Sequence, residues 1–218
     1  MSSDISVIMT VRNGRMFIKR SIESILNQTL SPKEVVIVDD GSTDDTCKLI
    51  EELALNTLIS IVLIRTSGVG RSKALCLAVE KCSYEWVANL DVDDYWLPYK
   101  LEKQDEIISN EKNVQVIVTQ CYRLHENEVD NFIVDKTPKE LSYKRLDKKD
   151  FYAKNPVNHS SVIFRKSLYK SVGGYNCELK KQIDYDLWAK FILNSVVFYQ
   201  VNSSLTVKYL HSKQSFEA

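Results

Sequence analysis

The amino-acid sequence predicts a single α/β domain in which helices cover both faces of a mostly parallel sheet, giving three layers, α/β/α. Two observations lead to this fold class. Residues 1–98 alternate short runs of β-branched residues with longer amphipathic stretches, which is the pattern of consecutive βαβ units. The chain of 218 residues is 44% hydrophobic and 27% charged, an ordinary composition for one globular domain with one sizeable core.

The elements of the first half follow from this alternation. Apolar residues recur three or four positions apart between Met16 and Gln28, as they do along one face of a helix. Ser42 or Thr43 is the expected cap of the second helix, because a hydroxyl oxygen can accept from the free N–H groups of a first turn. The predicted strands are Ile5–Thr10, Glu34–Asp39, Leu58–Arg65 and Trp86–Leu90, and the predicted helices are Met16–Gln28, Thr43–Ala54 and Val69–Cys82.

The alternation becomes less regular after Pro98. A polar segment from His125 to Lys154 carries no clear hydrophobic period and so indicates no regular helix or strand. The remaining elements predicted in this half are helices at Tyr99–Ser109 and Lys180–Leu193, with strands at Val114–Tyr122, Ser161–Arg165, Val196–Val201 and Thr206–Leu210.

Composition restricts the classes of partner and the compartment. Lys plus Arg and Asp plus Glu both number 29, so the chain has no overall positive field, and we expect no nucleic-acid partner. Five scattered cysteines without a C-x-x-C pair argue against a disulfide framework or a zinc site, and favour a reducing cytoplasm. No apolar run approaches the roughly 18 residues of a membrane span, so we expect a soluble or peripherally attached protein.

Three carboxylates, Asp91, Asp93 and Asp94, directly follow the predicted strand at Trp86–Leu90. Like charges placed so close together destabilise one another unless a cation neutralises them, and a hard divalent ion prefers oxygen ligands. The alternative is a solvated turn, where Asp is common. The sequence therefore predicts either a divalent metal site or a polar turn at the carboxyl end of this strand.

Two further segments lie where a parallel sheet binds ligands, after the carboxyl ends of strands. Asp39 ends an apolar strand, and Gly41 allows a sharp turn after it, so the carboxylate can accept from a base N–H or a ribose hydroxyl. Asp40 and Asp44 are interpreted as turn and cap residues. The segment Gly68–Lys73 opens a helix whose amino end favours an anion, and its alternative is an exposed first turn.

Three motifs in this order and spacing resemble the large family 2 of glycosyltransferases, which have the GT-A fold with a Rossmann-like sheet. They are Ser6–Asn13, Val38–Asp44 and Asp91–Asp94, and the resemblance extends over nearly the whole chain. It implies a single glycosyltransferase domain over residues 1–218. Residues 1–98 would then form the half that binds a nucleotide sugar, and residues 99–218 the half that binds the acceptor and carries the catalytic base.

The resemblance also assigns roles on the donor side. The cofactor is expected to be Mn²⁺ or Mg²⁺, with Asp93 as the principal ligand of a D-x-D motif. His211 matches a histidine often found near the metal or the diphosphate in this family, and a disordered tail is the alternative. The residues expected to bind the nucleotide are Thr10, Val11, Arg12, Asp39 and Arg71 at the uridine, Asp91 at the ribose, and Asp93 through the metal.

On the acceptor side, Asp184 matches the position of the family's catalytic base. Such a base is needed because a carboxylate must take the proton of the attacking sugar hydroxyl. Ile183 departs from the pattern, which usually has Glu there. Asp186 is the competing candidate, but helical geometry turns it about 200° away from Asp184. His159, Asp186 and Trp188 are expected near the acceptor, with a structural histidine as the alternative for His159.

The implied activity is transfer of a sugar, with inversion, from a nucleoside-diphosphate donor to a hydroxyl of a glycan or lipid-linked glycan in surface polysaccharide or glycolipid assembly. The donor is expected to be a UDP-sugar, with dTDP- and GDP-sugars left open. The basic stretch Lys136–Lys154 leaves room for a peripheral contact with the inner face of the membrane, against the simpler interpretation of a solvated face.

Two other functions remain as alternatives. A sugar-1-phosphate nucleotidyltransferase would need a Gly-rich phosphate loop after the first strand, and Val11–Gly14 is poor in glycine. A non-catalytic module that binds nucleotide sugars is favoured by Ile183 and opposed by the presence of Asp93 and Asp184.

Overall fold

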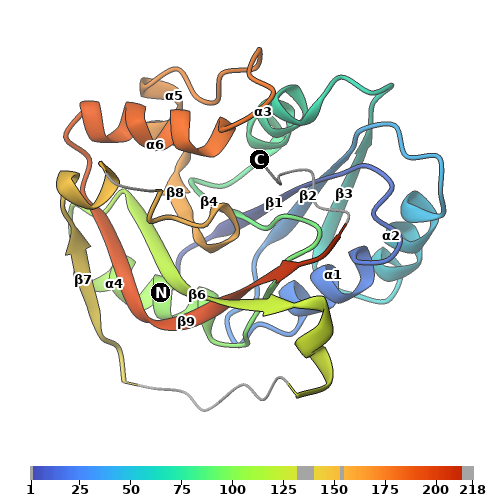
Figure 1. Cartoon of the computed structure of the whole chain (residues 1–218), viewed down its shortest axis with the longest axis horizontal. Helices are drawn as coiled ribbons and strands as arrows, with labels where there is room; N and C mark the ends of the chain where they lie inside the picture. Colours follow the sequence, from blue (N-terminus) through green and yellow to red (C-terminus); the bar gives the residue numbers. More distant parts are fainter. Residues whose placement is uncertain (1, 132–139, 153–154, 213–218) are drawn as a thin grey trace.

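The computed structural model describes residues 2–131, 140–152 and 155–212, and these form a mixed sheet of nine strands with helices packed on it (Figure 1). Neighbouring strands follow the order β3-β2-β1-β4-β8-β6-β9-β5, and β7 pairs with β9. The strands are β1 (Ile5–Val11), β2 (Glu34–Asp39), β3 (Ser60–Arg65), β4 (Trp86–Asn89), β5 (Tyr95–Trp96), β6 (Val116–His125), β7 (Tyr143–Leu146), β8 (Ile163–Arg165) and β9 (Phe198–Leu210).

The helices cover both faces of the sheet, because the strands of its centre are apolar on both sides. In β1, Val7 and Met9 pack into one buried cluster and Ile8 into another, as the alternation of side chains along a strand requires. The first cluster includes residues of α1, α2 and α4, and the second includes residues of α3, α5 and α6. The helices are α1 (Ile18–Leu26), α2 (Thr46–Ala54), α3 (Arg71–Lys81), α4 (Lys100–Asn110), α5 (Lys166–Ser171) and α6 (Ile183–Leu193).

This arrangement confirms the predicted α/β class. The ladders β1–β2, β2–β3 and β6–β9 are the long ones and are parallel, whereas the antiparallel ladders that involve β5, β7 and β8 are short. Among the described residues, no helix is long and apolar enough to cross a membrane.

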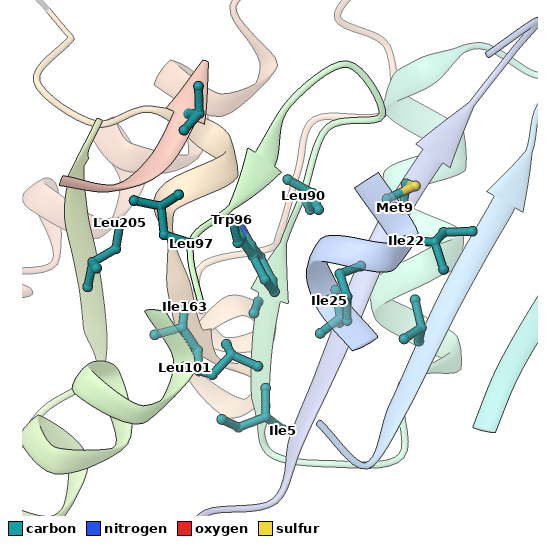
Figure 2. Close-up of a cluster of buried hydrophobic side chains, with 14 of the residues drawn as sticks. Ile5, Met9, Ile22, Ile25, Leu90, Trp96, Leu97, Leu101, Ile163 and Leu205 are labelled. Carbon is teal, nitrogen blue, oxygen red and sulfur yellow. The ribbon is translucent and has the colours of Figure 1, made fainter. Parts of the chain in front are cut away.

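The centre of the first cluster lies between the sheet and α1 (Figure 2). Ile22 and Ile25 of α1 are fully buried, with Ile22 beside Met9 of β1, and the buried Trp96 lies between Leu90 and Leu101. The Trp96 indole also donates to the carbonyl oxygen of Ser160 at 2.6 Å. This buried donor therefore has a partner, and the bond fixes the segment after Asp94 against the second half of the chain.

Several elements differ from the sequence prediction. The two strands predicted at Val196–Val201 and Thr206–Leu210 are one strand, β9, which pairs with β6 from Phe198 to Leu210 and with β7 over Phe198–Val201. The short elements β5, β7 and α5 were not predicted. The expected cap of α2 at Ser42 or Thr43 is wrong, because the helix starts at Thr46 and Ser42 instead accepts from a neighbouring loop.

The expectation of no disulfide is also wrong, since Cys76 and Cys177 are bonded with their Cα atoms 6.7 Å apart. Cys76 lies on α3, and Cys177 lies in the loop before α6. Two further contacts hold this loop on the same helix: the Ser72 hydroxyl donates to the Leu179 carbonyl, and Lys73 lies 3.7 Å from Glu178. The fold thus joins two cysteines whose separation in sequence gives no sign of pairing.

Replacing Cys76 with serine in the oxidised protein is expected to lower the free energy of unfolding by about 2 to 4 kcal/mol. The bond closes a loop of 101 residues, and opening it returns conformational freedom to the unfolded chain. Urea unfolding measures the change, with Cys47→Ser as the control because Cys47 is a free, partly buried thiol. A reductant should lower the stability of the unmodified protein equally, and an unchanged midpoint in both experiments would contradict the assignment of the bond.

Candidate functional site

The site is built where the strand order reverses beside β1, with β2 on one side of it and β4 on the other. The loops after β1 and β2 are tied together. The Asn13 amide donates to the Ser42 hydroxyl at 2.8 Å, and the Thr43 amide donates to the Asn13 side-chain oxygen at 2.8 Å. The loop that would receive a nucleoside is therefore held by its own polar side chains.

Asp39 and the end of β1, where the sequence predicts nucleoside contacts, lie side by side. Val11 pairs with Asp39 and Thr10 with Val38 in the parallel ladder, and Arg12 follows with an exposed side chain. The Asp39 side chain is 2% exposed, and its Oδ1 accepts from the Ser42 amide at 2.9 Å. Its buried Oδ2 has no hydrogen-bond partner among the described residues. Such an orphaned oxygen fits a site that a ligand N–H or hydroxyl completes.

Asp40 has a structural role, as the turn interpretation predicted. Its carboxylate accepts from the Thr66 hydroxyl and the Val69 amide at 2.6 Å, and from the Gly70 amide at 2.9 Å. The chain passes close by at this point, because a Cβ added to Gly41 would lie 3.1 Å from the backbone nitrogen of Gly68. Asp40 thus fixes the loop that leads into α3 and its first residue, Arg71.

Arg71 and His159 both contact Asp91, at the carboxyl end of β4. The Arg71 guanidinium donates to Asp91 Oδ1 at 2.8 Å, and His159 Nδ1 lies 3.0 Å from the same oxygen. Burial opposes the ionisation of Asp91, but the positive charge of Arg71 and the contact with His159 outweigh it and hold the pKa of Asp91 well below its usual range. The Asp91 carboxylate is therefore kept ionised and fixed in place.

Asp91 is expected to make the free energy of unfolding depend on pH. The pKa of Asp91 is lower in the folded protein than in the unfolded chain, where it is about 4. The ionised carboxylate therefore stabilises the folded protein fully above about pH 4, and this stabilisation is lost as the pH falls towards the folded pKa. At about pH 7, Asp91→Asn is expected to lower the free energy of unfolding by roughly 1 to 2 kcal/mol, a small value because solvent screens the partly exposed Arg71.

Denaturant unfolding at several pH values tests this expectation. The gap in stability between the unmodified protein and Asp91→Asn should narrow as the pH is lowered below about 4. Asp45→Asn is the control, because the Asp45 side chain is 58% exposed and pairs only at the surface, with Arg15. A gap that stays constant with pH would contradict the role given to Asp91.

Asp93 and His211 are brought together from distant parts of the chain, with His211 Nε2 3.3 Å from Asp93 Oδ2. The His211 ring packs against Phe17 at a centroid distance of 4.5 Å. Beneath them, the Arg20 guanidinium lies against the ring of Tyr209 and donates to the Asp93 carbonyl at 2.8 Å. The ring of Phe17 and the guanidinium of Arg20 therefore hold the two predicted metal ligands in one place.

This pair fits a metal that is bound jointly with a phosphate group. Within residues 2–131, 140–152 and 155–212, no group of three or more His, Cys, Asp or Glu side chains is placed to hold an ion by itself. Mg²⁺ in particular is commonly held by one or two carboxylates together with the phosphates of the substrate, and imidazole suits several divalent ions. Asp93 and His211 are the two residues that could take part in such a donor set.

Asp94 turns inward, unlike Asp91 and Asp93. It is 3% exposed, accepts from the Ser160 hydroxyl, and accepts from the Tyr209 amide at 3.0 Å. Burial and the nearby negative charges of Asp93 and Asp91 raise the pKa of Asp94 well above its usual range. Asp94 therefore joins the loop after β4 to β9, and so supports the position of His211 just beyond that strand.

Asp184 lies in the first turn of α6, which follows Gln182 in a left-handed conformation, with φ of 54°. Its Oδ2 accepts from the side-chain amide of Asn155 at 3.0 Å. Burial opposes the charge of Arg71, but the negative charges of Asp91, Asp184 and Asp93 outweigh it and raise the pKa of the guanidinium. The predicted base thus shares one electrostatic environment with the two carboxylates after β4.

The three residues expected near the acceptor lie in different settings. Both ring nitrogens of His159 have partners, because Nε2 lies 2.8 Å from the Tyr175 hydroxyl and Nδ1 contacts Asp91. Asp186 pairs with Lys190 at 2.8 Å along α6. Trp188 is fully buried, with its ring 6.2 Å from that of His159. In this structure Trp188 packs beneath the site, and the contacts of His159 support its structural alternative.

Some residues of the site were missed by the sequence analysis. Asn89 is fully buried, and its side-chain amide lies 2.9 Å from His159 Nδ1 and 3.3 Å from Asp91 Oδ1. Tyr175 supports the other nitrogen of His159, and Arg20 supports Asp93. Only Asn89 had a visible signal, because it is a polar residue in an otherwise apolar strand.

Comparison with known proteins shows the family of the chain. Residues 6–173 match the model of a protein family described as Glycosyl transferase family 2. The O-antigen biosynthesis glycosyltransferase WbnJ of Escherichia coli is 35% identical over 192 residues, which are 86% of this chain and 71% of WbnJ. The amylovoran biosynthesis glycosyltransferase AmsE of Erwinia amylovora is 30% identical over 176 residues, which are 80% of this chain and 64% of AmsE. This chain therefore spans only part of the length of these relatives.

Among solved structures, residues 1–349 of S. aureus TarS in complex with UDP-GlcNAc align with a TM-score of 0.78 and 21% identity, over 99% of this chain and 62% of that one. A likeness at this identity shows the fold, and it confirms the predicted fold class. The family model covers most of the chain, and WbnJ is similar over most of its own length. The chain therefore belongs to glycosyl transferase family 2.

Proposed function

We propose that this protein transfers a sugar, with inversion at the anomeric carbon, from a UDP-sugar to a hydroxyl of a glycan or lipid-linked glycan. One observation carries the proposal. The Arg71 guanidinium donates to Asp91 Oδ1 at 2.8 Å, and its pKa is raised by the charges of Asp91 and Asp93 from the first half of the chain and of Asp184 from the second, against the effect of burial. Residues suited to a nucleoside diphosphate and a carboxylate suited to act as a base therefore meet at one site.

The donor end is supported by Asp39, whose buried Oδ2 has no partner among the described residues. The imide N–H of uracil is a donor that such an oxygen can accept from. TarS, which has a similar fold, is described in complexes with UDP and with UDP-GlcNAc. A uridine nucleotide with its base at Asp39 and its ribose towards Asp91 is the donor that these observations favour.

Asp93 and His211 would hold Mn²⁺ or Mg²⁺ together with the diphosphate, as their closeness suggests. When bound, such an ion would offset the negative charge that develops on the departing nucleoside diphosphate. Arg71 supplies a fixed positive charge beside the same carboxylates, and Asp91 keeps that charge oriented. The protein's own contribution at this end is therefore to place the diphosphate.

At the acceptor end, Asp184 would take the proton of the attacking hydroxyl. The acceptor oxygen forms its bond to the anomeric carbon while the bond from that carbon to the diphosphate oxygen breaks, so a single displacement inverts the configuration. The alternative is a non-catalytic module, and Ile183 favours it, because this position carries a buried side chain where the family pattern usually has Glu. Membership of a glycosyltransferase family argues against the nucleotidyltransferase.

The setting is proposed from the relatives. WbnJ is named for O-antigen biosynthesis and AmsE for amylovoran biosynthesis, so we infer a surface polysaccharide or glycolipid intermediate as the acceptor. The basic stretch Lys136–Lys154, proposed for peripheral contact with a membrane, lies partly outside the described residues. The disulfide between Cys76 and Cys177 removes the observation on which the cytoplasmic prediction was based.

Calorimetric titration of UDP and CDP against Asp39→Asn tests the donor assignment. Asparagine can keep the bond from the Ser42 amide through its oxygen, so that its NH₂ group replaces the orphaned Oδ2. We expect UDP to bind at least about 10-fold more weakly, because a hydrogen bond to a charged group is lost, while CDP, whose N3 accepts, binds no more weakly. Asp45→Asn is the control, and equal losses for UDP and CDP would contradict the assignment.

A further inference from the structure

Asn155 contacts Asp184 in a fixed orientation. Its side-chain Nδ2 donates to Asp184 Oδ2 at 3.0 Å, and its Oδ1 accepts from the Val157 amide at 3.1 Å. The second bond closes a local Asx turn, so it determines which end of the amide is oxygen. The NH₂ group must therefore face the carboxylate.

Both partners are anchored by buried neighbours. Val157 is 3% exposed, and the segment continues into the short 3₁₀ helix His159–Ser161, which is buried beneath the site. On the other side, Ile183 and Leu187 of α6 are buried in the core. The Asn155 amide thus approaches Asp184 from a segment that lies outside α6 and is itself tied to His159.

We propose that Asn155 is the positioning residue of the base Asp184, an inference that rests on the function proposed above. The amide occupies Oδ2 and so directs Oδ1 of Asp184 towards the acceptor hydroxyl. Position 183 carries Ile where the family pattern usually has Glu, and Asn155 supplies a neutral partner for Asp184 instead.

The groups that face Asp184 from the neighbouring elements are few among the described residues. Arg71, at the start of α3, interacts with it electrostatically, and so does Tyr175, from the loop before α6. On α6 itself, Asp186 pairs with Lys190, and the Tyr185 hydroxyl donates to the Phe151 carbonyl. A change at Asn155 therefore alters the hydrogen bonding of Asp184 without removing any of these charges.

The test compares Asn155→Asp with Asn155→Ala by release of UDP from UDP-GlcNAc, or from another UDP-sugar that the unmodified protein turns over. Asn155→Asp keeps the acceptor of the Asx turn but replaces the amide donor with a second negative charge beside Asp184. We expect kcat to fall about 10- to 100-fold, as for the loss of a hydrogen bond to a charged group, with the donor KM unchanged. The acid limb of the pH–rate profile should move to higher pH, while the melting temperature stays within about 2 °C.

Asn155→Ala loses both bonds, so we expect a smaller movement of the acid limb together with some loss of stability. A purely structural role predicts the reverse order: Asn155→Asp would behave as the unmodified protein, and only Asn155→Ala would be impaired. That result, with Asp184→Asn inactive, would overturn the positioning role alone. An active Asp184→Asn would instead overturn the assignment of the base, and the inference with it.

Discussion

The Asp184→Asn variant is expected to lose about 100-fold or more of the rate of sugar transfer while it still binds the nucleotide donor. Asparagine has nearly the same shape as aspartate but cannot take a proton from the acceptor hydroxyl. It can still accept from the Asn155 amide through its oxygen, so the fold around the first turn of α6 should persist. The measurements are kcat and the donor KM, with a titration of UDP to show that binding is kept.

Asp186→Asn is the matched control, because it makes the same change of charge two residues along the same helix. Asp186 pairs with Lys190 and is turned away from Asp184, so we expect a change of less than about 10-fold in kcat. If Asp186→Asn were inactive and Asp184→Asn active, the two carboxylates would have to exchange roles. If neither variant lost activity, the base would lie elsewhere.

The Asp93→Asn variant is expected to lose about 100-fold of activity and most of its response to added Mn²⁺ or Mg²⁺. A neutral amide is a weaker ligand for a divalent ion than a carboxylate. Of the pair Asp93 and His211, only His211 would then be left unchanged to bind the ion. Measuring the rate of UDP release against metal concentration separates a loss of metal affinity from a loss of rate at saturating metal.

The control for Asp93→Asn is His211→Gln, which leaves the carboxylate in place. We expect a smaller loss, because the carboxylate is the charged member of the pair and is expected to contribute more to binding a cation. Equal and full activity of Asp93→Asn with and without metal would contradict the proposed metal site.

The first half of the fold could be predicted because its signals are local. The β-branched runs of β1, β2 and β4 are buried on both faces, and such strands appear in the sequence as continuous apolar segments. The polar residues that follow them are placed by the parallel sheet itself, which brings the carboxyl ends of β1, β2 and β4 to one edge. Asp39, Asp91 and Asp93 were therefore predicted at the site from their positions in the chain.

The second half was predicted less well because its elements depend on distant partners. β5 and β7 are strands of two and four residues that, in the described part of the chain, pair only with β9. Nothing in so short a segment indicates a strand without its partner. The polar residues Asn202–Ser204 separate the two predicted strands, and the ladder between β6 and β9 is irregular there, yet it resumes at Ser204 and runs on to Leu210.

Side-chain partnerships of the site could not be predicted for the same reason. Nothing in the spacing of Cys76 and Cys177 indicates that α3 and the loop before α6 meet. Two of the bonds that hold Asp91 also come from distant segments, with Arg71 on α3 and His159 after β7. The sequence therefore identified the carboxylates by residue type and position, whereas their distant hydrogen-bond partners became visible only in the folded structure.

The central claim is that a nucleotide sugar is cleaved at this one site with help from both halves of the chain. The most direct measurement is release of nucleoside diphosphate from UDP-, GDP- and dTDP-sugars, with Mn²⁺ or Mg²⁺ and then with EDTA, by the unmodified protein, Asp93→Asn and Asp184→Asn. We predict release from a UDP-sugar that EDTA abolishes and that both variants lose. Binding of donors without cleavage of any, with glycan and lipid-linked acceptors present, would contradict the claim and favour a binding module.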